Sequence, residues 1–302
     1  MDYNVTILMA VYNGSKFIEE QINSIINQSY CKWNLIIRDD KSTDDTKFIV
    51  EKYCKKDNRI TYIYGEENLG QVMNFNELMK TSLDSEYIMF CDQDDVWLPN
   101  KIENTINRML EVENDKGKNE PILVYSDLKY VDENLKPLDA KKVDISPKSL
   151  ESLLGFNYIW GCTMMLNKAL INMAYPISKK TQNHDYWIAL HAQLKGTIEY
   201  LSEETMFYRQ HSNNVTGGIN NYSFKSKMKK IGKMYDVYNV QIEQNLEFCK
   251  KYKNEKNQVL LRYNNIFSNG KITSVIKAIK FNLKRPSWKD TLLFYTYLVF
   301  RQ

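Results

Sequence analysis

The sequence predicts an α/β fold, with a mainly parallel sheet flanked by helices and a helical tail at the C-terminus. Short apolar runs alternate with segments whose apolar residues recur at helical spacing, which is the pattern of repeated strand–helix–strand units. Acidic clusters directly follow two of the apolar runs, and parallel sheets bind ligands beyond the carboxyl ends of their strands. After residue 221 the chain becomes rich in lysine and helical in pattern.

The N-terminal half alternates strands and helices. Ser42 and Thr43 suit a helix N-terminus, and Pro99 suits the first turn of a later helix. The apolar runs predict strands at 5–11, 33–37, 60–64, 87–91 and 122–126. The helical spacing predicts helices at 17–26, 42–53, 71–81 and 97–113. Such alternation indicates strands that run mostly parallel.

From about Pro147 this rhythm changes. Residues 162–166 form an apolar run, and residues 197–201 and 207–211 are expected to be two further extended pieces. A helix is expected to begin at Asn183 and to end near Lys195. A polar loop, 212–221, then separates the body of the protein from its tail.

Composition excludes several classes of protein. The chain has 302 residues, of which 43% are hydrophobic and 26% charged, so it can bury a full core and is not disordered. No run of about 20 apolar residues predicts a membrane span, and the N-terminus lacks the basic region of a signal peptide. Five scattered cysteines indicate free thiols in a reducing compartment. None of the three histidines pairs with a cysteine at the spacing of zinc ligands, which argues against a structural zinc site. These features predict a cytoplasmic protein.

Charge is distributed unevenly along the chain. Residues 222–289 hold 16 basic and four acidic residues, whereas residues 1–221 have a net charge of −8. Lysines interleave with apolar side chains from 224 to 235, and aromatic residues follow from Trp288 to Tyr297. A basic, aromatic helix can lie on an anionic membrane surface. The alternative is a helical subdomain with a solvated, lysine-rich face.

The acidic segment after the fourth expected strand is the strongest candidate for chemistry. Asp92, Asp94 and Asp95 place three carboxylates within four residues, which repel one another unless a cation or hydrogen-bond donors lie among them. Oxygen ligands at a strand end suit Mg²⁺ or Mn²⁺, above all when a substrate phosphate completes the coordination. The alternative is a solvated acidic loop.

Three other positions could carry function. Asp39 and Asp40 end the second expected strand, where a carboxylate could accept the N3–H of uracil or thymine, or stabilise a helix start instead. Asp185 stands among aromatic residues at a helix start and could be a partly desolvated base. A lone histidine such as His211 more often has a structural role, but its neighbour Arg209 and the polar loop that follows leave a phosphate contact open as the alternative. The sequence contains no P-loop, GxGxxG or GxSxG motif.

Taken in order, these segments resemble the family 2 glycosyltransferases, which have the GT-A fold. The resemblance covers roughly residues 3–217. It is carried by the first strand with Asn13-Gly14, by Arg38-Asp39-Asp40, by Asn68-Leu69-Gly70, by Asp92-Gln93-Asp94-Asp95-Val96-Trp97, which is similar to the DxD motif, and by His184-Asp185-Tyr186-Trp187. The DQDD-W segment with Tyr208-Arg209-Gln210-His211 further resembles bacterial rhamnosyltransferase-type enzymes.

The resemblance implies a binding site for a nucleotide sugar, with UDP or dTDP as the nucleotide. Ala10 and Tyr12 would line the nucleotide pocket, although the family often has proline where this chain has Ala10. Asp39 would hold the pyrimidine ring, with Asp40 beside it. The implied domains are a glycosyltransferase domain, 1–221, with a nucleotide-sugar half, 1–127, and an acceptor half, 128–221. A basic helical region, 222–302, would follow.

The resemblance also assigns the catalytic roles. Asp92 would contact ribose or sugar, Asp94 would bind Mn²⁺ or Mg²⁺ together with Asp92, and Asp95 would touch the donor sugar. His211 would reach the phosphate or the metal, and Asp185 would deprotonate the acceptor hydroxyl. A single base and a metal-held leaving group give one in-line displacement, so the configuration at the anomeric carbon is expected to invert.

The leading hypothesis is therefore a metal-dependent inverting glycosyltransferase of bacterial surface polysaccharide synthesis, with rhamnose as the suggested donor sugar. Its partners would be a nucleotide sugar, a glycan or lipid-linked acceptor and an anionic membrane at the inner face of the plasma membrane, with no nucleic acid. The alternative is a phosphatase or phosphotransferase with an aspartyl nucleophile, which usually has its acidic pair on the first strand. A third possibility is a nucleotidyltransferase, which would need a glycine-rich basic loop near the N-terminus. A fourth is a non-catalytic polyanion-binding protein, which would use the basic tail alone.

Overall fold

The computed structural model describes residues 3–139, 144–146, 148–211, 224–268 and 270–301, with the backbone alone at 224–231 and 233. The chain divides into two compact units. The first comprises Met1–Ile145, Ile159–Ile177 and Asn183–Ile219, and the second comprises Ser146–Tyr158, Ser178–Gln182 and Asn220–Gln302. The predicted boundary at 221 and the polar loop 212–221 lie outside the described residues. The predicted functional domains stay a prediction.

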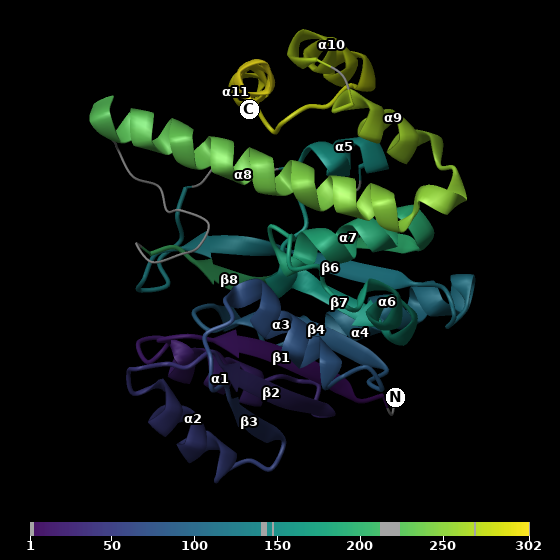
Figure 1. The fold of residues 1–302 in the computed structure, drawn as a ribbon. Coiled ribbons are helices and arrows are strands. Elements are labelled where there is room, and N and C mark those ends of the chain that lie inside the picture. Colours follow the sequence, from purple (N-terminus) through teal and green to yellow (C-terminus); the bar gives the residue numbers. More distant parts are fainter. Residues whose placement is uncertain (1–2, 140–143, 147, 212–223, 269, 302) are drawn as a thin grey trace. The chain divides into compact units, whose positions relative to one another are not determined.

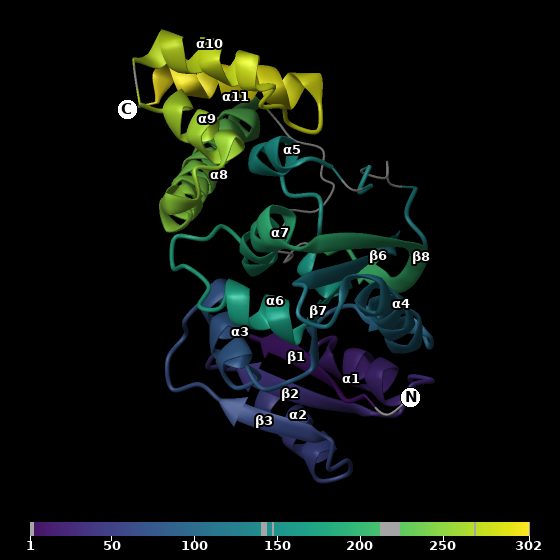
Figure 2. The same ribbon diagram turned by 90° about the vertical axis from the view of Figure 1, so that its right-hand side faces the viewer.

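The first unit is built on an eight-stranded sheet with helices on both faces (Figures 1 and 2). Its described strands are β1 (Val5–Val11), β2 (Trp33–Asp39), β3 (Ile60–Tyr64), β4 (Tyr87–Asp92), β5 (Val96–Trp97), β6 (Ile122–Val131), β7 (Met164–Asn167) and β8 (Thr197–Arg209). Their order across the sheet is β3-β2-β1-β4-β7-β6-β8-β5. The first four of these strands are parallel, β6 and β8 are parallel, and β7 and β5 run antiparallel to their neighbours. The predicted α/β class with a mainly parallel sheet is confirmed.

The helices of this unit follow the strands as the apolar spacing requires. They are α1 (Ile18–Ile26), α2 (Thr46–Cys54), α3 (Gln71–Lys80), α4 (Lys101–Lys116), α6 (Lys168–Ala174) and α7 (His184–Lys195), with a 3₁₀ turn, η1 (Gly161–Thr163), before β7. In α1, for example, Ile18, Ile22 and Ile25 share one face and are fully buried in the core. Burial of such faces against the sheet is what stabilises these short helices.

Two expectations were wrong. Trp97 does not begin a helix. It lies in β5, where it pairs with Met206 of β8 and donates its backbone N–H to the Ser24 hydroxyl at 3.0 Å. The helix starts only at Lys101, after Pro99. The two extended pieces at 197–201 and 207–211 are one strand, because β8 keeps pairing with β6 through two register shifts between Ser126 and Lys129.

The second unit contains the helices α5 (Leu150–Gly155), α8 (Phe224–Lys251), α9 (Gln258–Ile266), α10 (Lys271–Phe281) and α11 (Trp288–Phe300), with a 3₁₀ turn, η2 (Lys253–Glu255). Side-chain amides of α8 bind the end of α5, since Gln241 and Asn245 both donate to the carbonyl of Leu154. The helical character of the tail is thus confirmed for the described residues. The lysine-rich side chains of residues 225–233 fall outside them. Within the described part of the chain, no helix combines the length and apolarity needed to cross a bilayer.

Candidate active site

The sheet brings the acidic motifs to one edge. Strands β2, β1 and β4 are adjacent and parallel, so their carboxyl ends coincide. Val11 pairs with Asp39 on one side, and Ala10 pairs with Asp92 on the other. The expectation that the acidic clusters lie at neighbouring strand ends is therefore confirmed.

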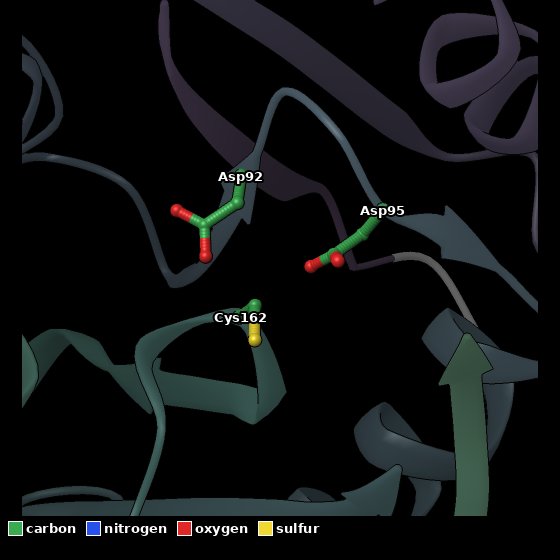
Figure 3. Close-up of side chains that lie close together, drawn as sticks. All are labelled: Asp92, Asp95 and Cys162. Atoms are coloured by element: carbon green, nitrogen blue, oxygen red, sulfur yellow. The ribbon is translucent and has the colours of Figure 1, made fainter. Parts of the chain in front are cut away.

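Asp92, Asp95 and Cys162 form the centre of the edge. One side-chain ligand atom from each lies within 4.8 Å of those from the other two. Asp92 ends β4 and Asp95 precedes β5, and Cys162 of η1 lies below the two carboxylates in Figure 3. Burial, followed by the charge of Asp94, raises the pKa of Asp92 to about 7 and raises that of Asp95 well above its usual range. A nearby positive charge would stabilise the ionised form of both carboxylates.

Lys101 supplies a buried positive charge behind this cluster. Its side chain is fully buried, donates to the Thr205 hydroxyl at 3.1 Å and lies 5.0 Å from the Trp97 ring centroid. Burial lowers the pKa of Lys101 to about 8, and its charge in turn lowers the pKa of Asp95. Oδ2 of Asp95 is buried and has no hydrogen-bond partner among the described residues. The single positive charge of Lys101 therefore offsets the negative charge of the acidic cluster only in part.

The side chain of Asp94 pairs with that of His211. His211 Nε2 lies 2.8 Å from Asp94 Oδ2, and both side chains are largely buried. The His211 ring also packs on Phe17 with ring centroids 5.0 Å apart. The end of β8 thereby brings an imidazole to the acidic loop from 117 residues away in the sequence.

Arg209 holds this loop in place. Its backbone N–H donates to Asp95 Oδ1 at 3.1 Å, and its guanidinium donates to the backbone carbonyl of Asp94 at 2.8 Å. The guanidinium also donates to the Glu133 carbonyl and to the Glu20 carboxylate, and its side chain is 1% exposed. Arg209 thus organises the acidic loop from within the protein.

We expect Arg209→Met to lower the free energy of unfolding by at least about 2 kcal/mol, because it leaves two backbone carbonyls without their donor. Urea titration measures the change. The control is Lys16→Met, which removes an exposed pair with Glu133 and should cost less than about 1 kcal/mol. Equal stabilities for the two variants would show that Arg209 does not hold the loop.

Asp185 lies in the first turn of α7, and its side chain is buried. Its Oδ2 accepts the backbone N–H of Gly161 at 3.0 Å. Burial raises the pKa of Asp185 to about 7, and the charge of Asp185 helps to raise the pKa of Asp92. Gly161 directly precedes Cys162, so its hydrogen bond places Asp185 beside the acidic cluster. A carboxyl with a pKa near neutrality suits proton transfer at physiological pH.

His184, which precedes Asp185, is a packing residue. Its ring lies 3.9 Å from the Phe75 ring and 4.8 Å from the Phe90 ring, and burial lowers its pKa to about 3, so it is neutral. A Cβ at Gly161 would lie 2.4 Å from His184 Nε2, so only glycine fits there. This close contact fixes η1, and with it the backbone N–H that Asp185 accepts.

Asp39 and Asp40 are both buried and bind different parts of the protein. Asp39 accepts the Ser42 N–H and the Tyr62 hydroxyl, each at 2.7 Å. Asp40 accepts the backbone N–H groups of Leu69 at 2.9 Å and Gly70 at 2.7 Å. Asp40 therefore positions the turn before α3, and a direct contact between Asp40 and nucleotide stays a prediction.

Tyr12 and Ala10 lie at the end of β1. The Gln93 side-chain amide binds both backbone groups of Tyr12, accepting its N–H at 2.9 Å and donating to its carbonyl at 3.0 Å. The Tyr12 side chain is 48% exposed and is open to a ligand. Gln93 thereby locks the end of the first strand to the acidic loop.

Comparison with known proteins identifies the fold and the family. Residues 6–115 match the model of the family "Glycosyl transferase family 2". The dTDP-rhamnosyl transferase RfbG of Shigella flexneri is 32% identical over 241 residues, which cover 74% of this chain and 78% of RfbG. The chain belongs to glycosyltransferase family 2. A further relative of this glycosyltransferase is the Escherichia coli UDP-Glc:alpha-D-GlcNAc-diphosphoundecaprenol beta-1,3-glucosyltransferase WfgD, 30% identical over 63% of this chain and 70% of WfgD.

Solved structures share the GT-A fold of this glycosyltransferase. Staphylococcus aureus TarS 1–349 in complex with UDP-GlcNAc matches 80% of this chain and 66% of that fragment of TarS, with a TM-score of 0.58 and 18% identity. The mannosyltransferase PcManGT of Pyrobaculum calidifontis, in complex with GDP-Man and Mn²⁺, matches 99% of this chain and 86% of its own, with a TM-score of 0.56 and 12% identity. The predicted fold is confirmed.

Several residues of the candidate site were missed by sequence reasoning. They are Gln93, Cys162, Lys101 and Gly161, together with the loop-holding role of Arg209. Gln93 stands inside the acidic motif and could have been singled out as its one uncharged member. The other residues reach the site only because segments that are distant in sequence come together in the fold, and no local sequence pattern marks them.

Proposed function

We propose that this glycosyltransferase moves a sugar from a nucleoside diphosphate sugar to a hydroxyl of a glycan or lipid-linked acceptor in bacterial surface polysaccharide synthesis. The names of RfbG and WfgD support a dTDP- or UDP-sugar, and RfbG supports rhamnose. The observation that carries the proposal is a buried carboxyl, Asp185, beside an acidic cluster at the carboxyl edge of the sheet.

The donor set fits a divalent cation. Asp92 and Asp94 both offer carboxylate oxygens, and the charge of Asp94 acts on Asp92. His211 offers an imidazole nitrogen beside Asp94, and the buried Oδ2 of Asp95 has no hydrogen-bond partner in the part of the chain that the structure describes. Oxygen ligands suit Mg²⁺ and Mn²⁺, and the imidazole favours Mn²⁺. When bound, the ion would stabilise negative charge on the leaving diphosphate. We assign Asp94, Asp92 and His211 as its ligands.

The protein's own residues bind the nucleotide and move the proton. Asp39 accepts N3–H of a pyrimidine, since each of its oxygens can accept a second hydrogen bond. Ala10 and the exposed Tyr12 line the nucleotide pocket, Asp40 orders its rim through Leu69 and Gly70, and Asp92 and Asp95 face ribose and sugar. Asp185 accepts the proton of the acceptor hydroxyl as that oxygen attacks the anomeric carbon.

We expect the product to have the anomeric configuration opposite to that of the donor, because one base and one leaving group give a single in-line displacement. Proton NMR of the product, through the coupling of the anomeric proton, distinguishes the two configurations for sugars in which that coupling is diagnostic. Rhamnose needs the one-bond carbon–proton coupling instead. Retention would contradict the mechanism.

The aspartyl-phosphatase alternative is not favoured, because family membership and the fold both point to sugar transfer. For the domains we propose 1–221 as the catalytic part, with nucleotide and acceptor halves at 1–127 and 128–221, and 222–302 as a basic helical region. We also propose that the protein acts in the cytoplasm, at the inner face of the plasma membrane, where a lipid-linked acceptor would be reached.

A further inference from the structure

We infer that one face of the α10–α11 hairpin docks on an anionic membrane surface. We use the name outer face for the exposed apolar side chains of this hairpin, which are Ile272, Ile276 and Ile279 of α10 and Trp288, Leu292 and Phe300 of α11. The inference rests on the proposed function for its biological purpose, because a lipid-linked acceptor is presented at a membrane. The side chains of the outer face belong to the described part of the second unit, and the lysines of 225–233 are not part of this face.

Helix α10 is apolar on both faces. Ser274, Ala278 and Phe281 form its buried face, and the Phe281 ring lies 5.7 Å from that of Tyr263 in α9. Ile272, Ile276 and Ile279 repeat at the same spacing, two residues out of phase, and so lie on the opposite face of the helix. They are 72%, 49% and 55% exposed. Packing within the second unit therefore does not account for these three isoleucines.

Helix α11 shows the same division. Phe294, Tyr297 and Leu298 are its buried residues, and the Phe294 ring lies 5.2 Å from that of Tyr238 in α8. Trp288 and Leu292, one turn apart, are 72% and 57% exposed, and Phe300 at the end of the helix is 72% exposed. Because α11 has 13 residues, it is too short to span a bilayer and is suited to lie along its surface.

The two helices form one hairpin that is fixed to the second unit. They lie side by side in both views (Figures 1 and 2) and make direct contacts. Between them, Arg285 donates to the Gly155 carbonyl at 2.5 Å and to the Gln241 side chain, and its guanidinium lies 4.9 Å from the Tyr238 ring. The Tyr295 hydroxyl donates to the Leu283 carbonyl at 3.1 Å. The hairpin that carries the outer face is thus held to the rest of the second unit by these hydrogen bonds and ring contacts.

Charge identifies the occupant of this face. Residues 270–301 carry seven basic side chains and one acidic one, Asp290, which is used at the start of α11, where it accepts the Ser287 hydroxyl at 2.6 Å. Lys271, Lys280, Lys284 and Lys289 are exposed, and three of them directly adjoin Ile272, Ile279 and Trp288 in the sequence. Exposed apolar and tryptophan side chains with lysines next to them in sequence complement a surface with an apolar interior and anionic headgroups. An anionic bilayer has both properties.

Co-sedimentation of the full chain with lipid vesicles tests the inference. The vesicles contain phosphatidylcholine alone or mixed with phosphatidylglycerol. Ile276→Gln with Leu292→Gln removes apolar contacts, and Lys280→Gln with Lys284→Gln removes charge. The matched control is Phe48→Gln on α2 of the first unit, because Phe48 is 73% exposed and lies outside the hairpin. Circular dichroism verifies that all variants are folded.

We expect the wild type and Phe48→Gln to bind phosphatidylglycerol vesicles equally. Each double variant should bind at least about tenfold more weakly, and the lysine pair should account for most of the salt dependence. No binding by the wild type, or equal binding by all variants, would overturn the inference. So would self-association of the wild type that the apolar variant abolishes without any vesicle binding. Because sedimentation does not involve sugar transfer, its result is independent of the proposed enzymatic activity.

Discussion

Asp185→Asn is expected to lower kcat by about 10²- to 10⁴-fold while nucleotide binding is retained. The buried carboxyl is the proposed base, and asparagine cannot accept the acceptor proton. Asparagine keeps one carbonyl oxygen that can still accept the Gly161 N–H, so the start of α7 should stay in place. Single-turnover transfer and nucleotide titration together measure the two properties.

The pH dependence provides a second readout of the same residue. Only the ionised carboxylate is a base, so kcat/KM of the wild type should rise with pH up to about 7, the pKa of Asp185, and then level off. A cation bound beside Asp92 would move this limb to lower pH. The control is Asp84→Asn, since the Asp84 side chain is fully exposed, and its rate and profile should match the wild type. Loss of nucleotide binding in Asp185→Asn would contradict the base role.

Asp94→Asn is expected to raise the Mn²⁺ concentration needed for half-maximal activity by at least about 100-fold. Loss of a residue that only orients a ligand typically costs 10- to 100-fold in metal affinity, and a direct ligand should cost no less. The substitution keeps the size of the side chain and removes the charge that pairs with His211. A titration of activity with Mn²⁺ after treatment with EDTA measures the effect.

His211→Gln is the companion variant for the metal site. It removes the imidazole and leaves the three carboxylates, so its effect should be smaller than that of Asp94→Asn and should shift metal preference from Mn²⁺ toward Mg²⁺. Full activity of the wild type in EDTA would exclude the assigned metal role. A normal Mn²⁺ requirement in Asp94→Asn would exclude this ligand set.

Much of the sheet was predictable because its signals are local. The four parallel strands have apolar runs bounded by turn residues, and two of their carboxyl ends carry acidic motifs. The placement of Asp39 and Asp92 at the same edge of the sheet, one on each side of β1, therefore follows from topology. Trp97 was misassigned because its strand has only two residues and exists through pairing with β8. Pairing with a distant segment leaves no local pattern.

The residues that hold the acidic side chains of the site in place were harder to predict from the sequence than the acidic residues themselves. Arg209 contacts Asp95 across 114 residues of sequence, and Lys101 contacts Thr205 across 104. Their neighbours in sequence gave no reason to expect buried cations there. Asp40 shows the complementary case, in which a residue singled out for ligand binding accepts backbone N–H groups of a turn. Carboxylates that bind ligand and carboxylates that brace loops look alike in sequence.

Thermal unfolding with dTDP, UDP, GDP and ADP, each with Mn²⁺, Mg²⁺ or EDTA, tests the central claim most directly. A ligand at ~100 times its dissociation constant stabilises the native state by about 2.7 kcal/mol, which is enough to detect. The account predicts stabilisation by dTDP or UDP that requires the metal ion. A preference for GDP would contradict the role of Asp39, and the absence of stabilisation by every nucleotide would contradict the proposed nucleotide-sugar site.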